Sequence, residues 1–438
     1  MTARPCAWPP RTRATSAIRT RRRNPVPKHG RWQWRAARCH GMRAGRFRAS
    51  GMPCRRRPST PTGPRTGSPA PTSRAVPAVR TFGIEQEFFL INPATGLPAV
   101  PRHHVHNELM ALRSGGTHTH PEFLACQVEN STPICTTGAE ALEAVVAARQ
   151  DLSAVAREAG LQLVGLGTAP RIPAGPAPVH ASERYYAINR FCPGITSEHY
   201  VCGTHVHVGI EDLETGVQAL NSLRQWLPLL TALGANSPFW RGADSGFASW
   251  RTIAYLRWSI HGIPPHFADA RDYLARMEFL LASDVVLDAG HIGWGARLSA
   301  RFPTLEIRVA DAQMGASDVV VLALVMRALV SAGIHSPGRI PDPAPEALDM
   351  AQWQAAKFGT RGNHYDLAAG TKASLDRRLD ALLTYIGAEL EDSGDTDFVG
   401  TGLARIAGDG NGAAAQRSFF HAGGFDALIS EAGARILD

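Results

Sequence analysis

The sequence predicts an α+β fold with an antiparallel or mixed sheet and helices packed on one side of it. Short strand-like segments are separated by helical insertions of unequal length, which suits such a layered arrangement. Three of the predicted strands also carry ionisable residues at alternate positions. They are TFGIEQEFFL (81–90), CGTHVHVGI (202–210) and PTLEIRVAD (303–311). Because alternate side chains of a strand point the same way, one face of the sheet is predicted to be polar.

Residues 1–78 are predicted to form a disordered arm outside this fold. Residues 1–80 contain 20 of the 46 Lys and Arg residues and no Asp or Glu, among many Pro, Gly, Ser and Thr. Such a composition buries too little apolar surface to offset chain entropy. Its origin is open between an organellar transit peptide, a nucleic-acid-binding tail and a wrongly assigned start, of which we favour the last.

The remainder, 79–438, is predicted to be one acidic catalytic domain. From residue 81 onward, 26 basic residues stand against 38 acidic ones, a formal charge of −12, so the pI of 9.4 reflects the arm. The body therefore does not have the charge of a nucleic-acid-binding protein. The cysteines form no C-x-x-C pair, and no apolar secretory segment precedes the body. Both observations favour a protein of the reducing cytoplasm with free thiols.

Apolar periodicity and turn residues set the expected elements of the body. The strands are expected at 81–91, ending at the turn NPATG, at 161–170, at 202–210 and at 303–311. The helices are expected at 138–160, at 215–234 with a kink at Pro228, at 318–333 and through most of the last hundred residues. The loops are expected at the HHVH run (103–106), at 235–251 and at the Gly-rich stretch 408–417. The apolar run 319–330 is too short to span a bilayer and indicates a buried helix, so no membrane association is expected.

Alternation makes the first two polar strands candidates for a metal site. Glu85 and Glu87 share a face, with Gln86 on the opposite one, and neighbouring carboxylates repel each other unless a counter-charge is present. His205 and His207 share a face in the same way. The alternatives are a solvent-facing strand and hydrogen-bonded core histidines. Oxygen-rich surroundings without a cysteine cluster favour Mg²⁺ or Mn²⁺ over structural zinc.

Further candidates lie in three other segments. Glu306 and Arg308 share a face of the third polar strand, where a carboxylate could hold a metal and a guanidinium a phosphate, or the two could form a plain ion pair. Asp311 follows at the end of that strand. Glu122 and Glu129 are seven residues apart, so they share a face only if a bulge or turn intervenes. Arg251 follows the loop GADSG and is a candidate for anion binding.

Several blocks together resemble the carboxylate–amine ligases, also described as the glutamate–cysteine ligase type 2 family. The blocks are GIEQEF, PEFLACQVE, CGTHVHVGI, NSPFWRGADSGFASWR and PTLEIRVAD, in the family's order across about 81–420. The resemblance implies a glutamine synthetase-like fold, whose mainly antiparallel sheet lines the active site. It implies metal ligation by Glu85, Glu87, Glu129, His205 and Glu306, with Glu122, His207 and Asp311 as further candidates. It also implies substrate- or phosphate-facing arginines at Arg251 and Arg308 and ATP-binding residues at Lys357 and Arg417.

The implied function is an ATP- and Mg²⁺- (or Mn²⁺-) dependent ligase that joins a carboxylate to an amine through an acyl phosphate. A γ-glutamyl-cysteine-type bond, as in glutathione biosynthesis, is the expected product, with small-molecule substrates and a homodimer as expected partners. Family members usually have Glu where Gln86 stands, but this side chain is expected to point away from the acidic face. The alternative is a metal-dependent hydrolase that uses the same carboxylates and histidines to activate water.

Overall fold

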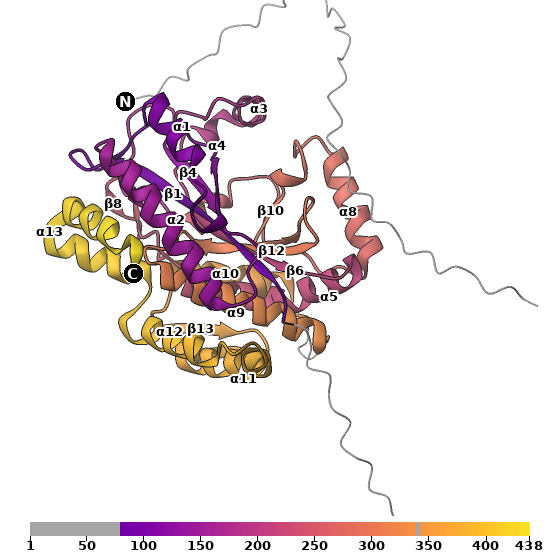
Figure 1. The fold of residues 1–438 in the computed structure, drawn as a ribbon. Coiled ribbons are helices and arrows are strands. Elements are labelled where there is room, and N and C mark those ends of the chain that lie inside the picture. Colours follow the sequence, from indigo (N-terminus) through magenta and orange to yellow (C-terminus); the bar gives the residue numbers. More distant parts are fainter. Residues whose placement is uncertain (1–78, 339–341) are drawn as a thin grey trace, which may run out of the picture. The chain divides into compact units, whose positions relative to one another are not determined.

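A large antiparallel sheet forms the centre of the fold (Figure 1). The computed structural model describes residues 79–338 and 342–438, so the predictions for the arm 1–78 lie outside the described residues. The main path of the sheet runs β11–β12–β6–β1–β4–β3, and β2 and β5 also pair with β1. Its strands are β1 (Phe82–Asn92), β2 (Leu97–Pro98), β3 (His118–Pro121), β4 (Gln127–Ser131), β5 (Gln162–Val164), β6 (Gly203–Gly209), β11 (Ala296–Leu298) and β12 (Thr304–Asp311).

The register of this sheet brings the three polar strands side by side. Glu85 of β1 lies opposite His205 of β6, and Glu87 lies opposite Glu129 of β4. On the other side of β6, His207 lies opposite Glu306 of β12. Because the strands are antiparallel and in register, the residues predicted to share a face within each strand share one face of the whole sheet.

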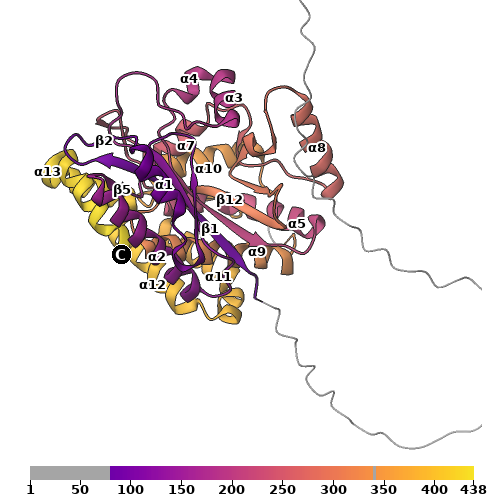
Figure 2. The same cartoon turned by 45° about the horizontal axis from the view of Figure 1, so that its top comes forward.

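Helices cover the opposite, apolar face, as the sequence predicted (Figures 1 and 2). Ile84, Val206 and Ile307 of the three strands join one buried core with residues of α2 (Gly138–Glu158), α5 (Leu213–Leu223) and α9 (Ala316–His335). A capping box between Thr137 and Glu140 begins α2. Outside α9 lie α11 (Leu375–Ser393) and α12 (Thr396–Asp409), whose apolar side chains extend the same core. The polar face is therefore the one left for a site.

Helix α9 confirms the buried helix expected at 318–333. By length and composition it could cross a membrane, and it is the one such helix among the described residues. However, 83% of its most apolar window is buried within the fold, where it lies between the sheet and the outer helices. It is thus a core helix of the domain.

Two expected elements in the first half of the body were wrong. The HHVH run is not a loop but begins α1 (His103–Ala111), in which Val105 and Leu109 are buried one turn apart. The strand expected at 161–170 ends at Val164, the last of its residues that pairs with β1. Beyond it, Gly167 and Thr168 make isolated backbone contacts with 201–202 instead. A Cβ on Gly165 would lie 2.2 Å from the carbonyl oxygen of Gln313.

In the second half of the body, the helices and strands follow the expected order, but two expected elements have different bounds. The helix expected at 215–234 is interrupted before Pro228, as α5 gives way to η2 (Arg224–Trp226) and α6 (Leu227–Leu233). The loop expected at 408–417 was wrong, because this Gly-rich stretch is helical except for a break between Asp409 and Gly412. The remaining helices are α3 (Glu183–Phe191), α4 (Pro193–Thr196), α7 (Trp250–Tyr255), α8 (Ala270–Ala282), α10 (Pro345–Phe358) and α13 (Gly412–Ala434). The remaining strands are β7 (Phe239–Trp240), β8 (Ala243–Asp244), β9 (His261–Gly262), β10 (Gly293–Trp294), β13 (Asn363–Asp366) and β14 (Thr371–Ser374), and the short 3-10 turns are η1 (Ser114–Gly116), η3 (Ala289–His291) and η4 (Arg435–Leu437).

Candidate active site

Glu85 lies at the centre of the polar face, between the two histidines of β6. Its Oε2 is 3.3 Å from His205 Nδ1 and its Oε1 is 3.3 Å from His207 Nε2. Burial favours the protonated form of Glu85, but its contacts with the two imidazoles bring its pKa below the usual range. Burial and the charge of Arg308 lower the pKa of His205 to about 4, so its ring is neutral near pH 7.

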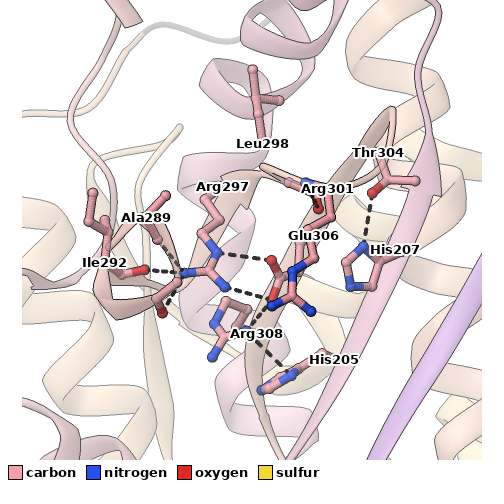
Figure 3. A network of polar contacts seen from close by, with 12 residues as sticks. His205, His207, Ala289, Ile292, Arg297, Leu298, Arg301, Thr304, Glu306 and Arg308 are labelled. Carbon is pink, nitrogen blue, oxygen red and sulfur yellow. Dashed lines mark hydrogen bonds and ion pairs between the residues drawn. The ribbon is translucent and has the colours of Figure 1, made fainter. Parts of the chain in front are cut away.

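Glu306 is the third member of this centre. One ligand atom each from Glu85, His205 and Glu306 lie within 4.8 Å of one another. Figure 3 shows that two arginines hold Glu306, with Arg297 Nε at 2.9 Å from Oε2 and Arg308 Nη1 in contact with Oε1. Burial alone would raise the pKa of Glu306, but these two guanidinium groups lower it below the usual range. The carboxylate is therefore ionised and buried.

A second acidic group lies along the sheet, at Glu87, Glu129 and Glu122. A turn at 123–126 separates Glu122 from β4, which explains how two residues seven apart come into contact. Burial, followed by the charge of Glu122, raises the pKa of Glu87 to about 8. Burial and the charge of Glu85 likewise hold the pKa of Glu129 well above its usual range. These carboxyl groups cannot all ionise together without a positive charge among them.

The arrangement fits a divalent cation. Carboxylate oxygens with one or two imidazoles form the donor set that suits Mg²⁺ or Mn²⁺, and the mutual repulsion of the glutamates would be relieved by such an ion. The buried Nε2 of His205 has no hydrogen-bond partner among the described residues and lies 3.6 Å from Glu87 Oε1. A buried nitrogen without a hydrogen-bond partner beside a carboxylate is suited to act as a metal ligand.

Arg251 reaches the same face from α7. Its guanidinium lies 4.7 Å from the centre of the Tyr255 ring, and its Nη1 and Nη2 donate to the carbonyl oxygen of Arg308 at 3.3 and 3.2 Å. It passes so close to Gly203 that a Cβ there would lie 2.3 Å from Nη2. A pocket of about 40 Å³ lies beside Arg251 and Arg308, and none of the described residues that line it is acidic. Because two guanidinium groups line it, this is an anion-type pocket, suited to bind a negatively charged group.

Asp311 is not part of the cluster formed by Glu85, His205 and Glu306, and its carboxylate is satisfied by hydrogen bonds. It accepts bonds from Asn236 N at 2.8 Å, Ser237 Oγ at 2.6 Å and Ser249 Oγ at 2.9 Å. Its side chain is fully buried, and Arg251 Nη1 is 3.9 Å away. Asp311 thus holds the segment 236–251 against the sheet. This contact fixes the position of Arg251 at the end of that segment.

Comparison with known proteins decides the family. The family model described as "Glutamate-cysteine ligase family 2 (GCS2)" matches residues 81–429. The chain belongs to this family. A Saccharopolyspora erythraea protein named "Putative glutamate–cysteine ligase 2-1" is 39% identical over 78% of this chain and 90% of its own length. A Mycolicibacterium vanbaalenii protein named "Putative glutamate–cysteine ligase 2-2" is 36% identical over 82% of this chain and 99% of its own length. The chain is accordingly a glutamate–cysteine ligase-like enzyme.

Solved structures confirm the fold. A glutamate–cysteine ligase from Francisella tularensis in complex with AMP has a TM-score of 0.60 at 12% identity, over 82% of this chain and 88% of that one. A bifunctional glutathione synthetase from Pasteurella multocida has a TM-score of 0.59 at 13% identity. This match covers 82% of this GCS2 chain and about half, 52%, of the Pasteurella chain. The predicted α+β fold, with a mainly antiparallel sheet and helices packed outside it, is therefore confirmed.

The two basic residues predicted to bind ATP in this GCS2 chain converge on the segment 244–247. Lys357 of α10 places its Nζ 4.5 Å from the centre of the Phe247 ring. Arg417 of α13 forms a two-pronged ion pair with Asp244, at 2.7 and 2.8 Å, and donates to the carbonyl oxygen of Phe247 at 2.9 Å. Both side chains therefore contact the loop that leads to Arg251, and their role in nucleotide binding remains a prediction.

Sequence reasoning missed Arg297, whose guanidinium holds Glu306. It lies on the short strand β11, directly opposite Glu306 in the register. The signal was present in the segment GARLSARFPTLEIR (295–308), where two strand-like stretches flank a polar turn, but β11 is only three residues long. A strand so short carries too little alternation to be recognised from sequence.

Proposed function

We propose that this GCS2 protein is an ATP-dependent carboxylate–amine ligase that uses Mg²⁺ or Mn²⁺. The observation that supports it most is the row of glutamates and histidines across β1, β4, β6 and β12, beside the anion-type pocket at Arg251 and Arg308. A ligase of this kind must bring together a substrate carboxylate and a triphosphate, which repel each other. Metal-binding carboxylates and arginines side by side are the groups that offset that repulsion.

Each group has a distinct proposed task. Glu85, Glu87, Glu129, His205 and Glu306 would hold the divalent ions, which when bound neutralise phosphate charge. Arg308, which contacts Glu306, would contact the transferred phosphoryl group, and Arg251 would orient the substrate carboxylate. Neutral His205 can offer a lone pair without first losing a proton.

The proposed reaction passes the γ-phosphoryl group of ATP to a substrate carboxylate, giving an acyl phosphate and ADP. The amine nitrogen then attacks the acyl carbon, and phosphate leaves with formation of an amide. We propose glutamate as the carboxylate substrate and cysteine as the amine, in line with the family, with Lys357 and Arg417 on the nucleotide. The expected partners are small molecules and a second copy of the chain.

Release of ADP in a screen of amino-acid pairs tests this function. The purified full chain is incubated with ATP, Mg²⁺ and each carboxylate–amine pair, and ADP and amide are measured together. We expect ADP to form only when both co-substrates are present, in a one-to-one ratio with the amide. ADP release without any amide would contradict the ligase. Hydrolysis of a substrate without ATP would favour the metal-dependent hydrolase, which no comparison supports.

A further inference from the structure

Arg297 links the candidate metal ligand Glu306 to a backbone turn on the other side of the site (Figure 3). On one side its Nε and Nη2 contact Glu306 at 2.9 and 3.3 Å, as a two-pronged pair. On the other side its Nη1 donates to three carbonyl oxygens of one turn, those of Ala289, Gly290 and Ile292, at 3.1, 3.0 and 2.6 Å. One guanidinium therefore fixes a side chain and a loop at once.

This use of its donors distinguishes Arg297 from the two arginines of the proposed substrate site. A guanidinium has five N–H donors, and Arg297 directs all three of its nitrogens at acceptors of the protein itself. Its side chain is 12% exposed. Arg308, in contrast, lines the anion-type pocket and makes its side-chain contacts through Nη1. Arg297 is thus committed to holding structure, with little capacity left for a ligand.

The turn 289–292, to which Arg297 donates its hydrogen bonds, is itself held by contacts of Asp288. Asp288 begins it by accepting a hydrogen bond from His291 N at 2.9 Å, and pairs with Arg184 of α3 at 2.8 and 3.1 Å. The turn and Arg184 lie close together, since a Cβ on Gly290 would lie 2.9 Å from Arg184 Nη2. The carboxylate of Glu306 is consequently tied through Arg297 to the turn and then to α3.

We propose that Arg297 is a positioning residue, which holds the Glu306 carboxylate in the single orientation that a divalent cation requires. The inference rests on the proposed metal role of Glu306 and deepens it. Partners that orient a metal ligand through hydrogen bonds typically change metal affinity by about 10- to 100-fold when they are removed. A fork-shaped guanidinium can grip both oxygens of a carboxylate, whereas a lysine ammonium is a point charge and cannot.

Direct measurement of Mn²⁺ binding tests the inference without relying on turnover. Calorimetry on the full chain, without nucleotide, would compare the unaltered protein with Arg297→Gln, Arg297→Lys and the matched control Arg276→Gln. Arg276 lies on α8 and pairs with Asp272 on the surface. We expect Mn²⁺ affinity to fall 10- to 100-fold in Arg297→Gln, to fall less in Arg297→Lys, and to stay unchanged in the control. Thermal unfolding of each metal-free variant checks that it is folded.

A double variant separates positioning from a general structural effect. If Arg297 acts through Glu306, adding Arg297→Gln to Glu306→Gln should cause no further loss of Mn²⁺ affinity. Unchanged affinity in Arg297→Gln, or independent losses that add in the double variant, would overturn the inference. So would a higher KM for ATP with unchanged Mn²⁺ binding, since the guanidinium would then contact nucleotide. Failure of the unaltered protein to bind Mn²⁺ would instead refute the metal centre itself, and the inference with it.

Discussion

At Glu85, a single carboxylate contacts two imidazoles, one through each oxygen. Replacing it by the isosteric Gln keeps the shape and removes the charge, so Glu85→Gln should lower kcat on the order of a hundredfold, through lost stabilisation of bound cation and phosphate charge. ADP release under saturating ATP and Mg²⁺ measures it. The control is Glu211→Gln, which removes the charge of a carboxylate that is 60% exposed and paired with Arg80, and it should leave kcat unchanged. Equal effects of the two would contradict the role of Glu85.

Also at the residue scale, His199 makes the stability of the fold sensitive to acid. It is buried among Phe123, Tyr255 and Trp258, and burial, with the charge of Arg257, lowers its pKa to about 3. The unfolded chain binds a proton near pH 6.5 and the folded one only near pH 3, so this histidine costs stability as the pH falls through that window. Between pH 6.5 and 4.5 we expect it to cost ~2 kcal/mol.

The variant His199→Phe should remove this contribution, because it fills the same aromatic site without a titrating group. Urea unfolding at a series of pH values gives the free energy of unfolding for both proteins. The difference between them should grow in favour of the variant as the pH falls below 6.5. A difference that stays constant with pH would show that His199 is not the group responsible.

At the scale of elements, the close approach of α7 to the start of β6 determines where Arg251 lies. Gly203 is the contact point, since a Cβ there would lie 2.3 Å from Arg251 Nη2 and 2.8 Å from its Cζ. The guanidinium cannot simply move aside, because Tyr255 and the carbonyl of Arg308 hold it. We therefore expect Gly203→Ala to lower kcat/KM at least about tenfold while the protein stays folded.

Kinetics of ADP release and thermal unfolding would be measured together on that variant. Gly194→Ala is a matched control, because a Cβ at Gly194 would have no atom of the described residues within 4 Å. A large loss of Tm with little change in the activity of the remaining folded protein would mean that Gly203 serves packing between the two elements rather than the placement of Arg251.

At the scale of the whole molecule, the sequence predicted features that follow from a repeated local pattern. It did not predict features that depend on contacts with segments distant in sequence. Alternation in the segments 81–90, 202–210 and 303–311 predicted which side chains share the polar face, and β1, β6 and β12 confirm it. The loop predicted at HHVH proved helical because two residues, Val105 and Leu109, bury against other elements. The strand predicted at 161–170 stopped early, where another segment lies against Gly165. The packing partners of α1 and the segment against Gly165 are both distant in sequence, so the residues around either site do not reveal them.

Arg149 shows the same limit, because nothing near it in sequence marks it as a central contact of the fold. It lies on α2, only 1% exposed, and donates to Gln86 Oε1 of β1. It also donates to the carbonyl oxygens of Gln313 and Met314, which follow β12, and of Ile436 near the end of the described chain. Gln86 does point away from the acidic face, as expected, and its partner there is this buried guanidinium.

Arg149→Met should therefore destabilise the whole fold rather than one element. Met fills similar volume but leaves three buried carbonyl oxygens and the Gln86 amide without their donor, at about 1–3 kcal/mol for each group. We expect the free energy of unfolding to fall by at least about 3 kcal/mol in urea, in one cooperative transition. Arg157→Met, two turns further along α2 on its exposed side, should change stability by less than about 0.5 kcal/mol. Similar losses in the two variants would show that α2 contributes through helix propensity, and that Arg149 does not join its distant segments.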